Sequence, residues 1–210
     1  YALRAAENGA FGPVGCECMT VAGPGGVINW TAAPTGGCYD LALVPGTEKI
    51  YVTDDSAGTV SILDADLSDA GEDDFPSPWS NPGGIAFVPA IQLGFPPQLF
   101  ENFIAIANTS DNRLRLASLA APESGTTINL RFPDEVENPR IGGLTYIPSD
   151  TPSLQRFVVT ERESKEIYIF RTNGNLARSC SPPSLFIDVS IGSGVSYDPL
   201  RDTFLTGFED

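Results

Sequence analysis

The sequence predicts an all-β fold, a β-propeller of four blades with four antiparallel strands in each blade. Three observations lead to this prediction: one short strand-and-turn motif occurs four times, glycine and proline are abundant, and no segment has the pattern of a long helix. The 210 residues include 21 Gly and 18 Pro, which suits many short strands joined by tight turns. The repeated motif is therefore the expected unit of the fold.

Each copy of the motif begins with small residues, continues through a short apolar run and ends at a proline, which terminates a strand. The copies are GCYDLALVP (37–45), GGIAFVP (83–89), GGLTYIP (142–148) and GSGVSYDP (192–199). When they are aligned, one column holds large side chains that we assign to the core between blades: Leu43, Phe87, Tyr146 and Tyr197. We expect each copy to form the inner strand of a blade, around one common axis.

Further strands follow each inner strand and are separated by polar hairpin connections. Second strands are expected at 49–55, 102–108, 156–162 and 203–210, and third strands at 59–66, 113–119 and 166–173. Weaker outer strands are expected at 26–32, 73–79, 126–132 and 184–190. The chain then forms a single domain over 1–210, with blades at about 26–66, 73–119, 126–173 and 184–210.

The last blade lacks its third strand at the C-terminal end of the sequence. Segment 1–9, YALRAAENG, is similar to the third strands of the other blades, so we expect it to complete the last blade and close the ring. A closed ring has no free sheet edge. If the segment reached a neighbouring molecule instead, through the Gly/Pro-rich linker 10–26, the chain would assemble head to tail into a filament. The alternative fold is a fragment of a six- or seven-bladed propeller.

Composition excludes several classes of function. The chain has 27 acidic and 12 basic residues, a net charge of −15 that would repel a nucleic-acid backbone, so we expect a protein or glycan partner and no nucleic acid. Histidine is absent, which excludes Ser-His-Asp and Cys-His catalysis and His-ligated zinc. No stretch approaches the roughly 20 apolar residues of a membrane-spanning helix.

Cysteines and sequons predict an extracellular, secreted protein stabilised by disulfides and carrying glycans. Cys16 and Cys18 are too close in sequence to bridge each other comfortably, so each is expected to pair with Cys38 or Cys180, in either combination. A thiolate metal site is the alternative. The two glycosylation sequons begin at Asn29 and Asn108. The sequence starts at Tyr1, as expected after removal of a leader or for a segment of a longer protein.

Propeller geometry places the starts of the inner strands and the ends of the second strands on one face. Carboxylates gather there in the sequence, and oxygen ligands suit Ca²⁺, so a calcium site is expected from Asp40, Asp54, Glu161 and Asp210. The alternative is that these are solvated hairpin tips, where Asp and Asn are favoured by turn geometry. Trp30 and Trp79 are candidates for stacking on a sugar or seating a partner, and packing between blades is the alternative.

The blade motif resembles that of the NHL- and YVTN-type propeller superfamily, including the stretch YVTD at 51–54. Segment 142–170 is also similar to blades of phytase-like and SdiA-regulated extracellular propellers. The resemblance spans nearly the whole chain and implies the fold without a substrate. Gluconolactonase-like propellers use metal carboxylates and phytase-like ones use Ca²⁺, which implies an alternative function, a Ca²⁺-dependent hydrolase of a lactone, ester or phosphate at the acidic channel mouth.

The sequence favours a binding or structural module that contacts a protein or glycan, with self-assembly by strand exchange as a further expectation. An enzyme that acts on phosphates is less favoured because arginines such as Arg113, Arg140, Arg156 and Arg171 are scattered over different strands and loops. No basic cluster is visible in the sequence, and no residue is therefore predicted to be catalytic.

Overall fold

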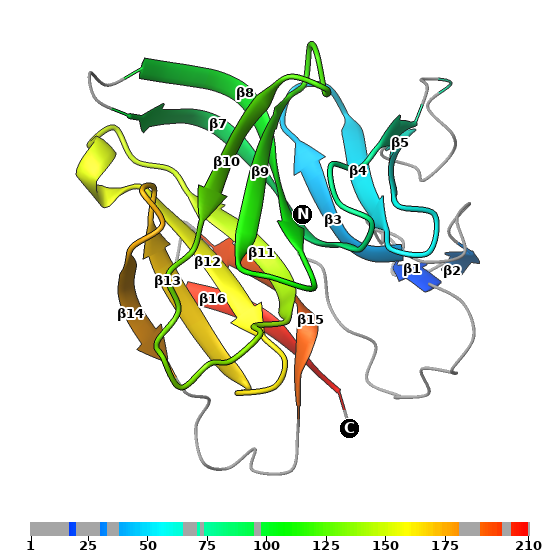
Figure 1. Ribbon diagram of the computed structural model, residues 1–210. Coiled ribbons are helices and arrows are strands. Elements are labelled where there is room, and N and C mark those ends of the chain that lie inside the picture. The colour runs from blue at the N-terminus through cyan, green and yellow to red at the C-terminus, as the bar shows by residue number, and fades with distance from the viewer. Residues whose placement is uncertain are drawn as a thin grey trace.

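The protein is an all-β structure with one short 3₁₀ turn, seen in a computed structural model (Figure 1). The structure describes residues 17–19, 30–32, 38–64, 71, 74–94, 98–180, 190–198 and 203–209, with side chains in 40–64, 71, 74–94, 98–180 and 194–197. Within these ranges no helix has the length and apolar character needed to cross a membrane. The all-β prediction is confirmed.

The first sheet contains four antiparallel strands in chain order, from the inside of the molecule outward: β3 (Cys38–Val44), β4 (Lys49–Asp54), β5 (Thr59–Asp64) and β6 (Phe75–Pro76). Apolar side chains on both faces of β4 are buried, which is expected for a strand sandwiched between neighbouring layers. The outer strand β6 is only two residues long because Pro76 and Pro78 cannot donate to a ladder.

The second sheet has the same order and includes the two longest strands: β7 (Pro82–Leu93), β8 (Gln98–Asn108), β9 (Arg113–Ser118) and β10 (Gly125–Asn129). The pairing of β8 with β9 begins at Phe103, whereas its pairing with β7 continues to Gln98. The segments 90–93 and 98–101 therefore form a hairpin that extends beyond the sheet, toward the upper left of Figure 1.

The third sheet contains β11 (Ile141–Ile147), β12 (Arg156–Glu161), β13 (Glu166–Arg171) and β14 (Leu176–Cys180), with the 3₁₀ turn η1 (Pro152–Leu154) between β11 and β12. Its outer strand β14 lies outside every range in which the sequence predicts a strand. The predicted strand at 184–190 lies, except for residue 190, outside the described residues. The turn after β13 is tight, with Gly174 at φ +81°, so β14 pairs back onto β13 directly after it. The sequence LARSC gives little strand signal of its own, and pairing to β13 decides its conformation.

Two smaller sheets complete the described structure: β15 (Ser190–Asp198) with β16 (Thr203–Glu209), and β1 (Glu17–Met19) with β2 (Trp30–Ala32). Segment 1–9, the expected closing strand, lies outside the described residues. The count of four blades and the closure of the ring therefore stay predictions. In each four-stranded sheet the outer strand follows the other three in the chain, whereas the predicted blade boundaries began with an outer strand.

The inner strands of successive sheets lie beside one another around a common axis. β3 contacts β7, β7 contacts β11, β11 contacts β15, and β15 contacts β3 more sparsely. This is the arrangement that the repeated motif predicts.

Apolar side chains fill the layers between neighbouring sheets. One core cluster joins the second and third sheets and includes Phe157 and Phe170, both fully buried. A second cluster joins the first and second sheets around Val60 and Ile106. Each fully buried side chain of this size contributes about 1.5–3 kcal/mol. Tyr146 belongs to the first of these clusters, as predicted for its column, and Phe87 packs against the second. Leu43 of the same column is 41% exposed, so its assignment to the core was wrong.

Close packing at the axis requires glycine at one position of the motif. A Cβ added to Gly84 would lie 2.6 Å from the carbonyl carbon of Gly143 and against the backbone nitrogen of Leu144, which cannot move aside easily. We expect Gly84→Ala to lower the free energy of unfolding by about 1–3 kcal/mol through overpacking, measured by urea denaturation.

Gly194 is the matched control, because it occupies the same column in β15 and no described atom lies within 4 Å of an added Cβ. Gly194→Ala is expected to change stability by less than about 0.5 kcal/mol. Equal losses in the two variants would contradict close packing of β7 against β11.

Candidate functional site at the propeller axis

The carboxylate of Asp40 accepts hydrogen bonds from the backbones of three inner strands. Its Oδ2 accepts from the N–H of Ile85 at 3.0 Å and of Leu144 at 3.3 Å, and its Oδ1 accepts from Leu41 at 2.9 Å. The three donors occupy the same column of the repeated motif, in β3, β7 and β11. One side chain therefore ties together three blades at their common axis.

These backbone N–H groups point at the axis because each inner strand is irregular just before that column. The pairing register shifts between Cys38 and Asp40, Pro82 and Ile85, Ile141 and Leu144, and Ile191 and Val195. A bulge removes a residue from the ladder and turns its N–H away from the neighbouring strand. The repeat thus creates a set of inward donors that need an acceptor.

Asp40 provides that acceptor, and glycines make room for it. The other repeats have Gly84, Gly143 and Gly194 at the position of Asp40, so the axis has space for one side chain. Asp40 is partly buried there. The sequence comparison of the repeats identified this single departure, but not the bonds that it makes.

Two buried threonines support the same end of the inner strands. Thr53 Oγ1 donates to the carbonyl oxygen of Gly83 at 2.8 Å and accepts from the N–H of Asp40 at 3.2 Å. In the third sheet, Thr160 Oγ1 accepts from the N–H of Gly143 at 2.7 Å. Both hydroxyls satisfy backbone groups that the bulges leave outside the ladders, so the network around Asp40 is held on several sides.

Burial is the main influence on the ionisation of Asp40. It raises the pKa of the carboxyl from 3.8 to about 7, while the three N–H bonds, led by that of Ile85, act in the opposite direction. Both carboxylate oxygens are occupied by backbone donors. The geometry therefore fits a carboxylate that positions strands.

Two of the other predicted calcium ligands serve the turns that follow their own strands. Asp54 Oδ1 accepts from the backbone N–H groups of Ser56 and Ala57, both at 2.9 Å. Glu161 is fully buried, and its oxygens accept from the N–H of Arg140 at 2.8 Å and of Ser164 at 2.6 Å. These are the bonds expected of acidic residues that cap hairpins.

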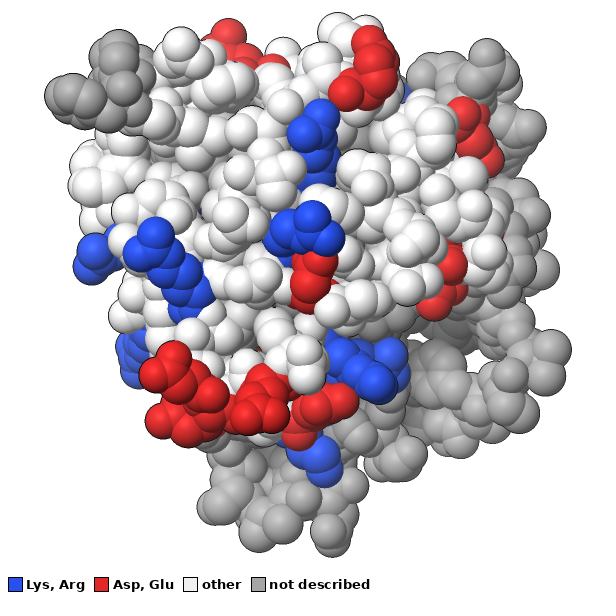
Figure 2. Space-filling view, in the orientation of Figure 1, with Lys and Arg blue, Asp and Glu red and all other residues white. Residues whose placement is uncertain are grey.

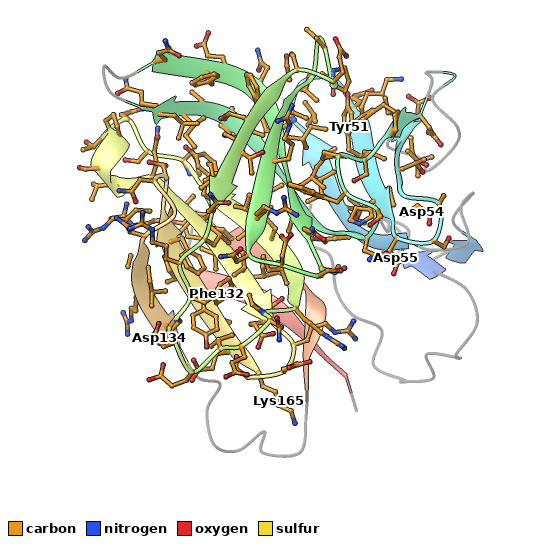
Figure 3. The ribbon with its side chains drawn as sticks, in the orientation of Figure 1. Tyr51, Asp54, Asp55, Phe132, Asp134 and Lys165 are labelled. Carbon is orange, nitrogen blue, oxygen red and sulfur yellow. The ribbon has the colours of Figure 1, made fainter. Side chains whose placement is uncertain are left out.

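Among the described residues, the acidic side chains of this face do not form a metal-binding group. Figure 3 shows Asp54 and Asp55 near each other, with Asp134 in another part of the molecule. Within the described residues, no group of three or more acidic or Cys side chains is placed to hold a metal ion. Asp210 lies outside those residues, so the four-carboxylate calcium site stays an untested prediction.

Trp79 packs between the first and second blades. Its Nε1 donates to the carbonyl oxygen of Ile106 at 3.1 Å, and its ring packs against the core cluster of these two sheets. The guanidinium of Arg113 lies 4.6 Å from the ring centroid, covers part of the ring and is itself held by Asp111 Oδ2, at 2.7 Å from Nε. These contacts fit the packing alternative. The side chain of Trp30 lies outside the described residues.

The predicted modification sites find limited support. Asn108 is only 7% exposed, and its Oδ1 accepts from the N–H of Ser110 at 3.1 Å, so its amide is poorly placed to carry a glycan. Cys180 has a free thiol, so the predicted disulfide is not supported. It lies on β14, a strand that the sequence did not predict. Asn29 and the side chains of Cys16, Cys18 and Cys38 lie outside the described residues.

Comparison with solved structures confirms a β-propeller fold. The structure of a nidogen/laminin complex matches with a TM-score of 0.54 and 14% identity, covering 87% of this chain and 63% of that chain. A streptogramin B lyase matches with a TM-score of 0.51 and 18% identity, covering 87% and 52%. Hydrazine synthase of Kuenenia stuttgartiensis matches with a TM-score of 0.52 and 14% identity, covering 82% and 42%.

The chain spans less than two thirds of the length of these structures, from 42% to 63%. No protein-family model matches the sequence, and no curated protein matches it either. At these identities the likeness concerns the fold alone.

The raised pKa of Asp40 predicts a specific pH dependence of stability. The unfolded chain releases this proton near pH 4, whereas the folded chain retains it until about pH 7. Between these values the folded state binds more protons, so the contribution of Asp40 to stability falls as the pH rises from about 4 to 7 and is constant above.

The measurement is urea denaturation of the wild type and of Asp40→Asn at several pH values, because Asn cannot ionise. The stability of the wild type minus that of the variant should fall over this pH range, by at most about 4 kcal/mol. A difference that stays constant with pH would contradict burial as the main influence on this group.

Proposed function

We propose that this chain is a β-propeller binding module that recognises a protein partner through the projecting part of the β7–β8 hairpin and the adjoining turn η1. The observation that carries the proposal is the exposure of two leucines on these elements, Leu99 and Leu154, each 57% exposed. Exposed apolar side chains on a rigid support are typical of protein-binding surfaces.

The elements that carry the two leucines adjoin each other. Leu99 is the cross-strand partner of Gln92 in the hairpin. The N–H of Gln92 donates to Oε1 of Gln155 at 3.4 Å, and Gln155 directly follows Leu154. A single register pair and a single hydrogen bond thus connect the hairpin leucine to the leucine on η1.

The projecting hairpin is held firmly at its base. Ile91 is fully buried in the core between the second and third sheets. The hydroxyl of Tyr146 donates to the carbonyl oxygen of Ala90 at 2.8 Å, and burial raises the pKa of this phenol, so it stays a donor. A surface that is already ordered loses little conformational entropy when a partner binds.

The fold and the charge of the chain support a protein partner. The nidogen/laminin structure shows a propeller of similar fold in a complex with another protein. The net charge of −15, with Glu101 exposed beside Leu99, favours a partner whose apolar contact area is surrounded by basic residues. An extracellular setting is part of the proposal, supported by the sequon at Asn29 and by the cysteines at 16, 18 and 38.

A paired substitution tests this surface. We expect Leu99→Ser combined with Leu154→Ser to weaken binding of the partner by at least about tenfold, because each leucine buries apolar area worth about 1.5–3 kcal/mol. The partner is first captured from an extracellular extract with the wild type, then purified, and its Kd is measured for each variant by calorimetry. Stability of the free chain should change by less than about 0.5 kcal/mol.

Leu43→Ser is the matched control, since Leu43 is 41% exposed and lies on β3, in another sheet. It should bind the partner as the wild type does. Unchanged affinity of the double variant for the partner would show that this surface is not the recognition site. An equal loss of affinity in Leu43→Ser would show the same.

We also propose that segment 1–9 completes the last blade by pairing with β16. Within the described residues β16 pairs with β15 on one edge, and no described strand covers its other edge. An exposed edge presents a row of unpaired backbone groups that favours addition of a strand. Pairing within one chain would close a four-bladed ring, and pairing between copies would form a filament.

Light scattering after size-exclusion chromatography, over a wide range of concentrations, separates the two forms of this proposal. We expect a monomer of 22.3 kDa throughout, as closure within one chain requires no second molecule. A mass that rises steadily with concentration would instead establish strand exchange between copies.

A further inference from the structure

We propose that three arginines, Arg131, Arg156 and Arg171, form a binding site for the phosphate or sulfate group of a small polar ligand. The site lies beside the third sheet, where two hollows of about 320 and 360 Å³ adjoin each other. Thr172 and Asn173 line both hollows, so the two hollows share a wall. Their volumes lie at the lower end of the range for small-ligand pockets.

Two of the arginines face each other directly. Arg156 on β12 is the cross-strand partner of Arg171 on β13, and both line the same hollow. Like charges at such a position repel and destabilise the sheet. Arg156 is held there, because its Nη1 donates to the carbonyl oxygens of Ser153 at 2.6 Å and Gln155 at 2.7 Å. A bound dianion between the two guanidinium groups would remove the repulsion.

The third arginine is brought to the site by backbone pairing. The N–H of Arg131 donates to the carbonyl oxygen of Gly174 at 2.9 Å, which fixes the segment after β10 against the turn after β13. Arg131 lines the hollow of about 320 Å³, together with Thr172 and Asn173. Residues 131, 156 and 171 are thus far apart in sequence and close in space, which is why the sequence showed only scattered arginines.

None of the three positive charges is neutralised within the described part of the chain. The described ion pairs are Lys49–Asp64, Arg113–Asp111 and Arg140–Glu163. In Figure 2 basic side chains gather at the left, over β13 and β14, while acidic side chains gather along the lower edge. Three arginines without an acidic partner are unexpected in a chain of net charge −15, where acidic residues outnumber basic ones.

The remaining lining defines the class of ligand. Thr126, Thr127 and Asn129 supply hydroxyl and amide groups, which suit a polar ligand rich in hydroxyls, such as a sugar. Neither hollow is lined by an aromatic side chain of the described residues, so stacking of nucleic-acid bases is not favoured. The overall negative charge disfavours a long polyanion. A compact phosphate or sulfate ester fits best.

Calorimetric titration of the whole chain tests the site with inorganic phosphate, inorganic sulfate, glucose 6-phosphate and glucose 6-sulfate, with sodium chloride at matched ionic strength as the reference. We expect binding of at least one of these probes with a Kd of about 1 mM or lower. Tighter binding of the esters than of the inorganic ions would identify a sugar-borne group, and equal binding would identify the free oxyanion as the ligand.

Arg171→Gln should weaken binding by at least about tenfold through loss of charge-assisted hydrogen bonds. Without ligand, it should raise the melting temperature, because the repulsion from Arg156 is removed. The control is Arg178→Gln, an exposed arginine on β14 that lines neither hollow and should bind within about twofold of the wild type. The proposal is overturned if no probe binds at about 10 mM, or if both variants lose affinity equally.

Discussion

The hydrogen bonds of the Asp40 carboxylate to three inner strands are the interaction on which the arrangement at the axis depends. Bulges in the inner strands turn backbone N–H groups toward a common line, and such groups are costly when they have no acceptor. One carboxylate satisfies the N–H groups of Leu41, Ile85 and Leu144 together. The same burial that makes these bonds strong also raises the pKa of the group toward neutrality.

This constraint explains the pattern of small residues in the other repeats. Where β3 has Asp40, β7 and β11 have Gly84 and Gly143, and their backbones approach so closely that a Cβ would collide. A side chain at position 84 would have no space, whereas position 194 is open. In β7, glycine therefore lets the blades pack around Asp40.

The segments that follow the repeat and the segments that depart from it have different roles in this protein. The regular parts form the scaffold: inner strands, hairpin caps such as Asp54 and Glu161, and apolar layers between sheets. The irregular parts are the lengthened β7–β8 hairpin, which extends beyond its sheet, and the Arg156–Arg171 pair at the ends of β12 and β13. A rigid repeated framework tolerates such local changes at its rim, which is where propeller-like scaffolds can present recognition surfaces.

The sequence by itself determined the all-β class, the inner strands and most of the second and third strands, because apolar alternation and terminal prolines are local signals. It also singled out Asp40 as the one acidic residue in its column. Only the tertiary structure decided what the polar residues do. Asp54 and Glu161 cap turns, Asn108 is buried, and Cys180 lies on a strand that forms by pairing with β13. Arg131, Arg156 and Arg171 line adjoining hollows for the same reason. Contacts between residues far apart in the chain depend on strand register and blade order, which no local pattern encodes.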